Sequence, residues 1–230
     1  MQGTSPSVLD VAGQPLACSW SGGKDSALAL HRAIRAGGRP LALLSMLTET
    51  GQRSRSHGLH VSMLRAQARA LGVPLVTRSA TWGDYEAAFL SALQEMSAVG
   101  VRAVVFGDID GESNRRWAEM LCTRGGLRAV EPLWARPRDE LLHEFLGLGF
   151  RATLVAVRDG VLDSAMLGRT LDETLLQEFV RAGIDLSGEG GEYHTVVTRG
   201  PLFAHPIELA PGQRVLRDGC WFLDVAVAGT

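Results

Sequence analysis

The amino-acid sequence predicts an α/β protein whose main part is a parallel sheet flanked by helices. Two observations support this prediction: apolar runs with strand character alternate with stretches of helical periodicity, and glycines stand where the helices would end. Short alternating elements of this kind are typical of a parallel sheet, because each crossover between parallel strands needs a helix. The predicted strands are 16–19, 41–47, 73–78 and 102–106.

The helices are predicted between these strands. The first would begin at Ser26, repeat its apolar residues at helical spacing, and end before the glycine pair Gly37 and Gly38. The other helices of this part are predicted over 60–71, 84–98 and 113–124.

The pattern changes after Pro132, which indicates a second domain. A helix is predicted over 138–148, a strand over 153–157 and a helix over 172–182, followed by β-like segments. We therefore predict that residues 1–134 form the sheet domain and that residues 135–230 form a smaller α+β domain.

The composition favours a cytoplasmic enzyme that acts on a small molecule. No apolar run approaches the ~20 residues that span a bilayer, and the first residues lack the pattern of a secretory signal. The formal net charge of −2 gives no basic field for holding a nucleic acid. Three widely spaced cysteines argue against a disulfide framework or a zinc ribbon. We expect no membrane partner, and a homodimer stays open.

A glycine loop between the first strand and the first helix is the main candidate site. Backbone N–H groups and a helix N-terminus converge there, which is typical of an anion site. Its hydroxyls can donate hydrogen bonds, its lysine can neutralise phosphate, and its aspartate can hold Mg²⁺. Lys24 in this loop is the only lysine among the 23 Lys and Arg residues of the chain. The six residues are Ser21, Gly22, Gly23, Lys24, Asp25 and Ser26.

Two further segments have candidate side chains. Residues 188–195 read Gly-Glu-Gly-Gly-Glu-Tyr-His-Thr, so that Glu189, Glu192 and His194 stand in a glycine frame. The carboxylates can bind Mg²⁺, hold an ammonium ion or act as a general base, for which His194 is a rival; a solvated turn is the alternative. His57, in a basic loop after the second strand, can touch phosphate or substrate carboxylate, or lie in a solvated loop.

The glycine loop resembles the PP-loop of the adenine nucleotide α-hydrolase superfamily, and the whole constellation resembles the diphthine–ammonia ligase family. The resemblance runs from about Leu16 to Phe203, and the segment 188–195 is its most specific part. It implies a five-stranded parallel sheet with flanking helices and a smaller C-terminal domain. The other matching elements are Gly107-Asp108-Ile109, Pro132-Leu133-Trp134 and Gly149-Phe150-Arg151-Ala152.

The resemblance also implies roles for residues. The loop 21–26 would bind ATP and Mg²⁺, Gly107 and Asp108 would lie beside the nucleotide, and Glu189, Glu192 and His194 would face the acceptor. One element departs from the family: a Tyr-Gln-Arg element is replaced by residues 113–116, Ser-Asn-Arg-Arg, of which only Arg115 matches. The arginine, alanine and glycine bias favours a bacterial homologue, and whether diphthine is the acid stays open.

The leading hypothesis is an ATP-dependent ligase. The resemblance implies that a small carboxylic acid is activated as an acyl-adenylate and captured by ammonia or another amine, with release of AMP and pyrophosphate. Lys24, Asp25, Glu189, Glu192 and His194 would be its catalytic residues. Two alternatives stay open: a nucleotide-binding regulatory module without turnover, and a PP-loop enzyme that modifies RNA.

Overall fold

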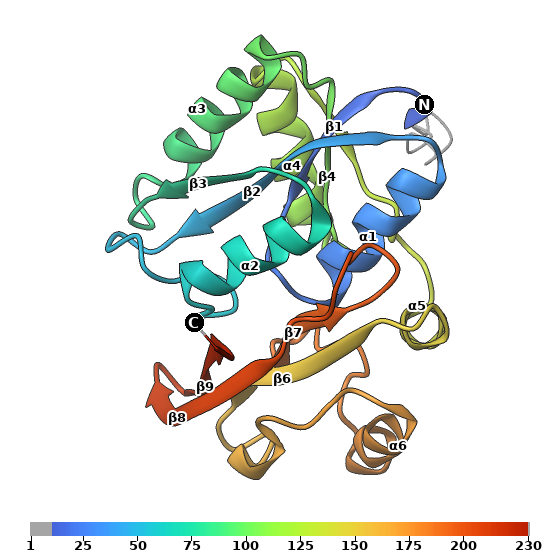
Figure 1. Ribbon diagram of the computed structural model, residues 1–230, viewed down its shortest axis with the longest axis vertical. Coiled ribbons are helices and arrows are strands. Elements are labelled where there is room, and N and C mark those ends of the chain that lie inside the picture. Colours follow the sequence, from blue (N-terminus) through green and yellow to red (C-terminus); the bar gives the residue numbers. More distant parts are fainter. Residues whose placement is uncertain (1–10, 230) are drawn as a thin grey trace. The chain divides into compact units, whose positions relative to one another are not determined.

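The structure is a computed structural model that describes residues 11–229, and its chain divides into two compact units (Figure 1). The chain passes between the units several times. Within the described residues, the first unit comprises 11–21, 25–51 and 73–135, and the second comprises 22–24, 52–72 and 136–229. The division at residues 134 and 135 stays a prediction for the sequence domains, because the contact-based second unit also takes in two earlier segments.

The first unit is built on the predicted parallel sheet. Its five strands lie in the order β3-β2-β1-β4-β5, and each neighbouring pair is parallel. From β1 the chain first adds β2 and β3 on one side and then returns to add β4 and β5 on the other side. The switch point therefore lies between β1 and β4, and α/β sheets bind ligands at such a point. The strands are β1 (Pro15–Ser19), β2 (Arg39–Leu47), β3 (Leu75–Ser79), β4 (Ala103–Val105) and β5 (Arg128–Val130).

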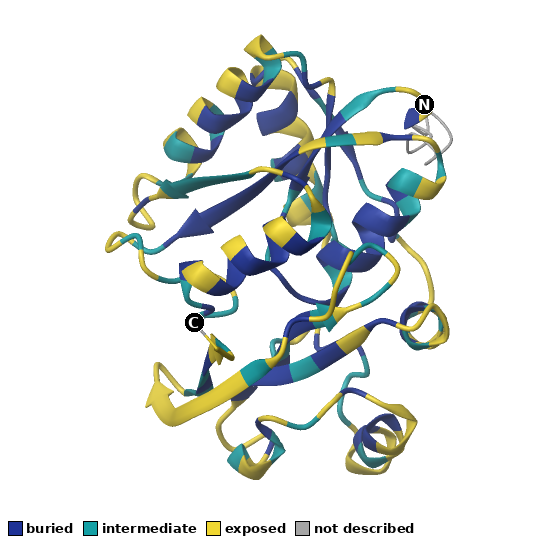
Figure 2. Ribbon diagram, viewed as in Figure 1, coloured by how far each residue is buried: buried dark blue, intermediate teal, exposed yellow. Residues whose placement is uncertain are grey.

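Three helices belong to this sheet, and two of them, over residues 85–98 and 112–124, form a core with its apolar side chains. Leu44 of β2 and Val104 of β4 are buried with Phe89 and Leu121 of the helices. Figure 2 shows the strands of the sheet largely buried and the outer side of α3 exposed. The helices are α1 (Lys24–Arg35), α3 (Tyr85–Ala98) and α4 (Glu112–Arg124). The first helix therefore begins two residues before the predicted Ser26, which places Lys24 and Asp25 in its first turn.

The second unit has an antiparallel sheet of four strands in the order β7-β6-β9-β8. Helix α2 (Val61–Leu71) packs against β9, and the ring of Phe222 on β9 fills the space beside Gly58. The strands are β6 (Arg151–Arg158), β7 (Tyr193–Arg199), β8 (Leu209–Arg217) and β9 (Cys220–Val227); the remaining helices are α5 (Arg138–Gly147), the 3-10 helix η2 (Ser164–Met166) and α6 (Glu173–Ala182).

Aromatic pairs and helix caps hold this unit together. Phe145 stacks on Phe150 with ring centroids 4.8 Å apart, and Phe179 of α6 meets Tyr193 of β7 at 5.1 Å. Helix α6 begins after Asp172, whose carboxylate accepts a hydrogen bond from the Leu175 amide at 2.8 Å. Among the described residues, no helix has both the length and the apolar character that a membrane span requires.

Candidate functional site

The phosphate loop follows β1, and Ser21, Asp25 and Ser26 of this loop belong to the first unit. The hydroxyl oxygens of Ser21 and Ser26 lie 3.1 Å apart. Gly107, just after β4, approaches this backbone so closely that a Cβ there would lie 2.8 Å from the Asp25 carbonyl carbon and the Ser26 nitrogen. Only glycine allows this approach, which keeps the end of β4 against the start of α1.

Asp108 lies next to Gly107 and is influenced by the charge of Asp25. Burial raises the pKa of Asp108, and the negative charge of Asp25 raises it further, while hydrogen bonds from its own backbone and from Asn114 act in the opposite direction. The negative charge of these two carboxylates would favour a bound cation. Among residues 11–229, however, no group of three or more His, Cys, Asp and Glu side chains is arranged to hold a metal ion.

The centre of the loop, residues 22–24, belongs to the second unit and is fixed by strand β7. The Gly22 carbonyl oxygen accepts hydrogen bonds from the Val197 amide and from the Gln67 side-chain nitrogen, both at 2.9 Å. The same Gln67 nitrogen donates to the Val197 carbonyl at 2.8 Å. Since Gln67 is fully buried on α2, it joins the loop to the strand by a satisfied polar contact.

Lys24 is buried and is in contact with the segment that carries the acidic motif. Its backbone nitrogen donates to the Thr195 hydroxyl oxygen at 3.1 Å, and its Nζ donates to the Ser187 carbonyl oxygen at 2.5 Å. The ammonium also lies 5.2 Å from the centroid of the Tyr193 ring. The structure therefore brings the only lysine of the chain together with the 187–195 segment, which the sequence did not predict as a direct contact.

His57 lies against the same loop as a neutral imidazole. Burial lowers its pKa to about 4; a hydrogen bond to the Thr195 carbonyl opposes this, and the charge of Lys24 adds to it. Nδ1 lies 2.9 Å from that carbonyl oxygen and must donate, so the Nε2 lone pair stays an acceptor. The ring stacks on His194 at 4.6 Å, and Gly23 lies directly beneath it. Of the sequence-predicted residues, His57, His194, Gly23 and Lys24 thus lie together.

Only part of the acidic segment 188–195 is a loop, whereas the sequence predicted a loop over its whole length. Tyr193, His194 and Thr195 are the first residues of β7, so only the glycine-glutamate part is a turn. Gly188 and Gly191 have φ angles of 70° and 77°, a region that favours glycine.

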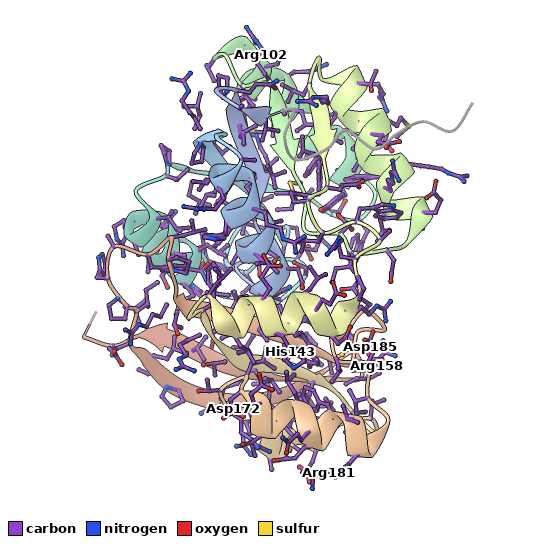
Figure 3. All side chains as sticks on the ribbon, turned by 90° about the vertical axis from the view of Figure 1, so that its right-hand side faces the viewer. Arg102, His143, Arg158, Asp172, Arg181 and Asp185 are labelled. Atoms are coloured by element: carbon purple, nitrogen blue, oxygen red, sulfur yellow. The ribbon has the colours of Figure 1, made fainter. Side chains whose placement is uncertain are left out.

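Asp185 organises this turn. Its carboxylate accepts hydrogen bonds from the Ser187 amide at 3.1 Å and the Glu189 amide at 3.0 Å, and it also pairs with Arg138. The guanidinium of Arg158, which is labelled in Figure 3 together with Asp185, donates to the Gly190 carbonyl oxygen. The turn is therefore held in one shape from both sides.

The two predicted carboxylates of the turn differ in exposure. Glu189 is exposed, whereas Glu192 is half-buried and its Oε2 has no hydrogen-bond partner among the described residues. Such an oxygen is free to accept a hydrogen bond from a ligand. Their assignment to the acceptor side stays a prediction.

A further acidic cluster was not predicted from the sequence. Glu131 follows β5, as Asp108 follows β4, and burial together with the charge of Asp108 raises the pKa of Glu131 to about 7. The Arg115 Nε lies 3.4 Å from a Glu131 oxygen, and the Arg115 guanidinium lies 4.9 Å from the Trp134 ring centroid. The sequence signal for Glu131 is its position directly after a strand. This strand, β5, is only three residues long and was therefore not recognised from the sequence.

Comparison with known proteins gives the family of the chain. The model of the diphthamide synthase N-terminal domain matches residues 15–129, and that of the C-terminal domain matches residues 137–227. Relatives named diphthine–ammonia ligase from Rattus norvegicus and Homo sapiens are each 28% identical, covering 90% of this chain and 86% of their own. A relative of the same name from Danio rerio is 28% identical over 89% of this chain and 90% of its own.

These matches extend over both units and include the phosphate loop and the acidic segment. The five-stranded parallel sheet expected from the resemblance is present, as is the separate C-terminal region. The bacterial origin stays a prediction. The chain belongs to the diphthamide synthase family and is an enzyme of the ligase class.

Proposed function

We propose that the protein uses ATP to adenylate a carboxylic acid and then transfers the acyl group to ammonia or another amine. Family membership implies the use of ATP. The observation that supports the proposal best is the contact of Lys24 with Ser187 and Thr195, because the ammonium proposed to bind phosphate then lies beside the segment proposed to face the acceptor. The products are an amide, AMP and pyrophosphate.

Two bond exchanges make up the reaction. A carboxylate oxygen attacks the α-phosphorus of ATP, and the bond to the bridging oxygen of the β-phosphate breaks. The amine nitrogen then attacks the acyl carbon, AMP leaves with the shared oxygen, and the nitrogen loses a proton to a base. The loop 21–26, with the Lys24 ammonium, would stabilise the charge on the departing pyrophosphate.

The base would come from the acidic segment. His57 is a poor choice, because a group with a pKa of about 4 binds a proton weakly at neutral pH. Glu192 is half-buried and has an oxygen without a partner in the described part of the chain, and His194, two residues further along the chain, stacks on His57. We propose Glu192 or His194 for this step and Glu189 for orienting the amine.

Mg²⁺ fits the carboxylates of the first unit. Asp25 and Asp108 offer hard oxygen ligands, and the charge of Asp25 raises the pKa of Asp108; the ion would neutralise the phosphates when bound. With fewer than three clustered ligands among the described residues, water and phosphate oxygens would complete the shell. Asp25 is the proposed direct or water-mediated ligand.

The identity of the acid is open. The curated relatives carry the name diphthine–ammonia ligase, and diphthine is therefore one candidate for an assay. The segment 113–116 differs from the family's Tyr-Gln-Arg element, so a pool of other small carboxylic acids should be tested beside it. Cytoplasmic location and a homodimer stay predictions.

Pyrophosphate release tests the proposal. Protein with ATP, Mg²⁺ and ammonium is expected to form AMP and pyrophosphate only when the correct acid is supplied. Lys24→Ala is expected to lose at least ~100-fold in turnover while keeping its circular dichroism spectrum, and Lys24→Arg should not restore activity if a slim ammonium is required. Full activity in Lys24→Ala would contradict the mechanism.

The assay also separates the alternatives. Tight ATP binding with no AMP across all acids would indicate a regulatory module, and adenylation of RNA would indicate an RNA-modifying enzyme. Because the chain contains a single lysine, protein labelled with ¹⁵N-lysine gives a single lysine amide signal in a two-dimensional NMR spectrum. A shift of that signal on adding ATP would report binding at the loop directly.

A further inference from the structure

Ser187 has a buried hydroxyl group that nothing in the described chain satisfies. The residue is 2% exposed, and its Oγ has no hydrogen-bond partner among residues 11–229. Its backbone is fully used: the amide donates to Asp185 and the carbonyl oxygen accepts from Lys24. Burying a hydroxyl without a partner costs free energy, so an unsatisfied one in a fixed backbone needs an explanation.

The position of this hydroxyl points to an anion. Lys24 Nζ lies 2.5 Å from the carbonyl oxygen of the same residue, so the unsatisfied donor and the only lysine occupy one place. The backbone amide of the same lysine donates to the Thr195 hydroxyl, which holds this part of the loop in place. A hydroxyl donates to phosphate oxygen, and a hydrogen bond to an ionised acceptor is stronger than one between neutral groups.

We propose that Ser187 is a phosphate ligand: its hydroxyl donates a hydrogen bond to the pyrophosphate part of the nucleotide, beside Lys24. This inference rests on the proposed function, and it extends the phosphate site from the glycine loop to a residue of the acidic segment. Ser187 belongs neither to the loop motif 21–26 nor to the motif 188–195, which begins one residue later.

Binding requires a local change that the structure allows. Lys24 and Ser187 are both buried, so the ammonium gives up the Ser187 carbonyl oxygen when the anion enters. Rotation about χ1 moves the serine oxygen among three staggered positions. Asp185 and Arg138 meanwhile hold the backbone of the turn in place.

The test uses inorganic pyrophosphate with Mg²⁺, measured by titration calorimetry on the full chain. Ser187→Ala is expected to raise the Kd about tenfold or more, as for loss of a hydrogen bond to a charged group. The same variant is expected to have an unchanged or higher Tm without ligand, because it removes an unsatisfied polar atom. A loss of binding without a loss of stability is the signature of a ligand role.

Two controls sharpen the result. Ser187→Cys keeps the size of the side chain but donates only weakly, so it should weaken binding like the alanine variant; Ser91→Ala, at an exposed serine of α3, should leave binding unchanged. Full affinity in Ser187→Cys or Ser187→Ala would overturn the inference and leave the proposed function standing. No pyrophosphate binding by the wild type would overturn both, and a fall in Tm matching the loss of affinity would indicate a structural role instead.

Discussion

Of the two glycines in the phosphate loop, Gly23 leaves less space for an added Cβ. A Cβ at this position would lie 2.2 Å from His57 Cε1 and 2.9 Å from His57 Nδ1. Gly23→Ala would therefore push the imidazole away from the Thr195 carbonyl and from the loop that its ring covers. We expect a destabilisation of about 1–3 kcal/mol and loss of ATP binding, measured by denaturant unfolding and calorimetry.

A matched glycine elsewhere provides the control for this variant. Gly147 ends helix α5, has no atoms within 4 Å of an added Cβ and no positive φ. Gly147→Ala should leave ATP binding unchanged and raise stability by about 0.4–1 kcal/mol, because alanine restricts the unfolded chain. Normal ATP binding in Gly23→Ala would show that His57 can move without affecting the loop.

Glu131 should make stability depend on pH in the direction opposite to most carboxylates. Burial and the charge of Asp108 raise its pKa from 4.5 to about 7, so the folded state holds the proton more tightly than the unfolded state. Stability therefore falls as the pH rises from about 4.5 to 7. Glu131→Gln removes this loss, and we expect it to be about 1–3 kcal/mol more stable than wild type at pH 8.

The pH series checks the cause of that gain. In denaturant unfolding, the advantage of Glu131→Gln should shrink toward zero as the pH falls to about 5, where the wild-type carboxyl holds its proton in the folded state. Glu119→Gln, which removes the more exposed carboxylate bound to Arg115, should not reproduce this pH dependence. A gain that is equal at all pH values would point to packing rather than titration.

At the scale of elements, the sequence predicted the long periodic segments and missed the short ones. Strand β5 is three residues long, so its apolar pattern is too short to recognise, although its parallel neighbour β4 was found within a longer apolar run. Helix α1 begins at Lys24, directly after the glycine pair. The apolar pattern starts only later, so it could not reveal the first helical residues. Strand β7 begins inside the glycine-rich segment because Tyr193 pairs with Val157, a contact distant in sequence.

The candidate site shows the same limit. The motif predicted the loop 21–26 and the acidic segment, since both are local patterns. It did not reveal Ser187, Gln67 or Asp185, because their importance arises from contacts with residues more than 40 positions away or from the closing of a turn. Buried polar side chains of this kind are visible only when burial and partners are known together.

At the scale of the whole molecule, the second unit is discontinuous in sequence, and this leads to a prediction about fragments. It contains residues 22–24 and 52–72 as well as the C-terminal part, and α2 from the middle segment packs against β9. A chain of residues 136–230 would lack α2 and expose the apolar surface that α2 covers. We expect this fragment to bind an apolar dye and to lack a sharp thermal transition.

Adding the missing segment should reverse this behaviour. A peptide of residues 52–72 provides the buried residues of α2, which packs against β9. With this peptide the fragment is expected to lose dye binding and gain a cooperative transition, whereas a scrambled peptide of the same composition should have no effect. A fragment 136–230 that unfolds sharply without any peptide would instead favour the continuous C-terminal domain of 135–230, because its apolar core would then be complete without α2.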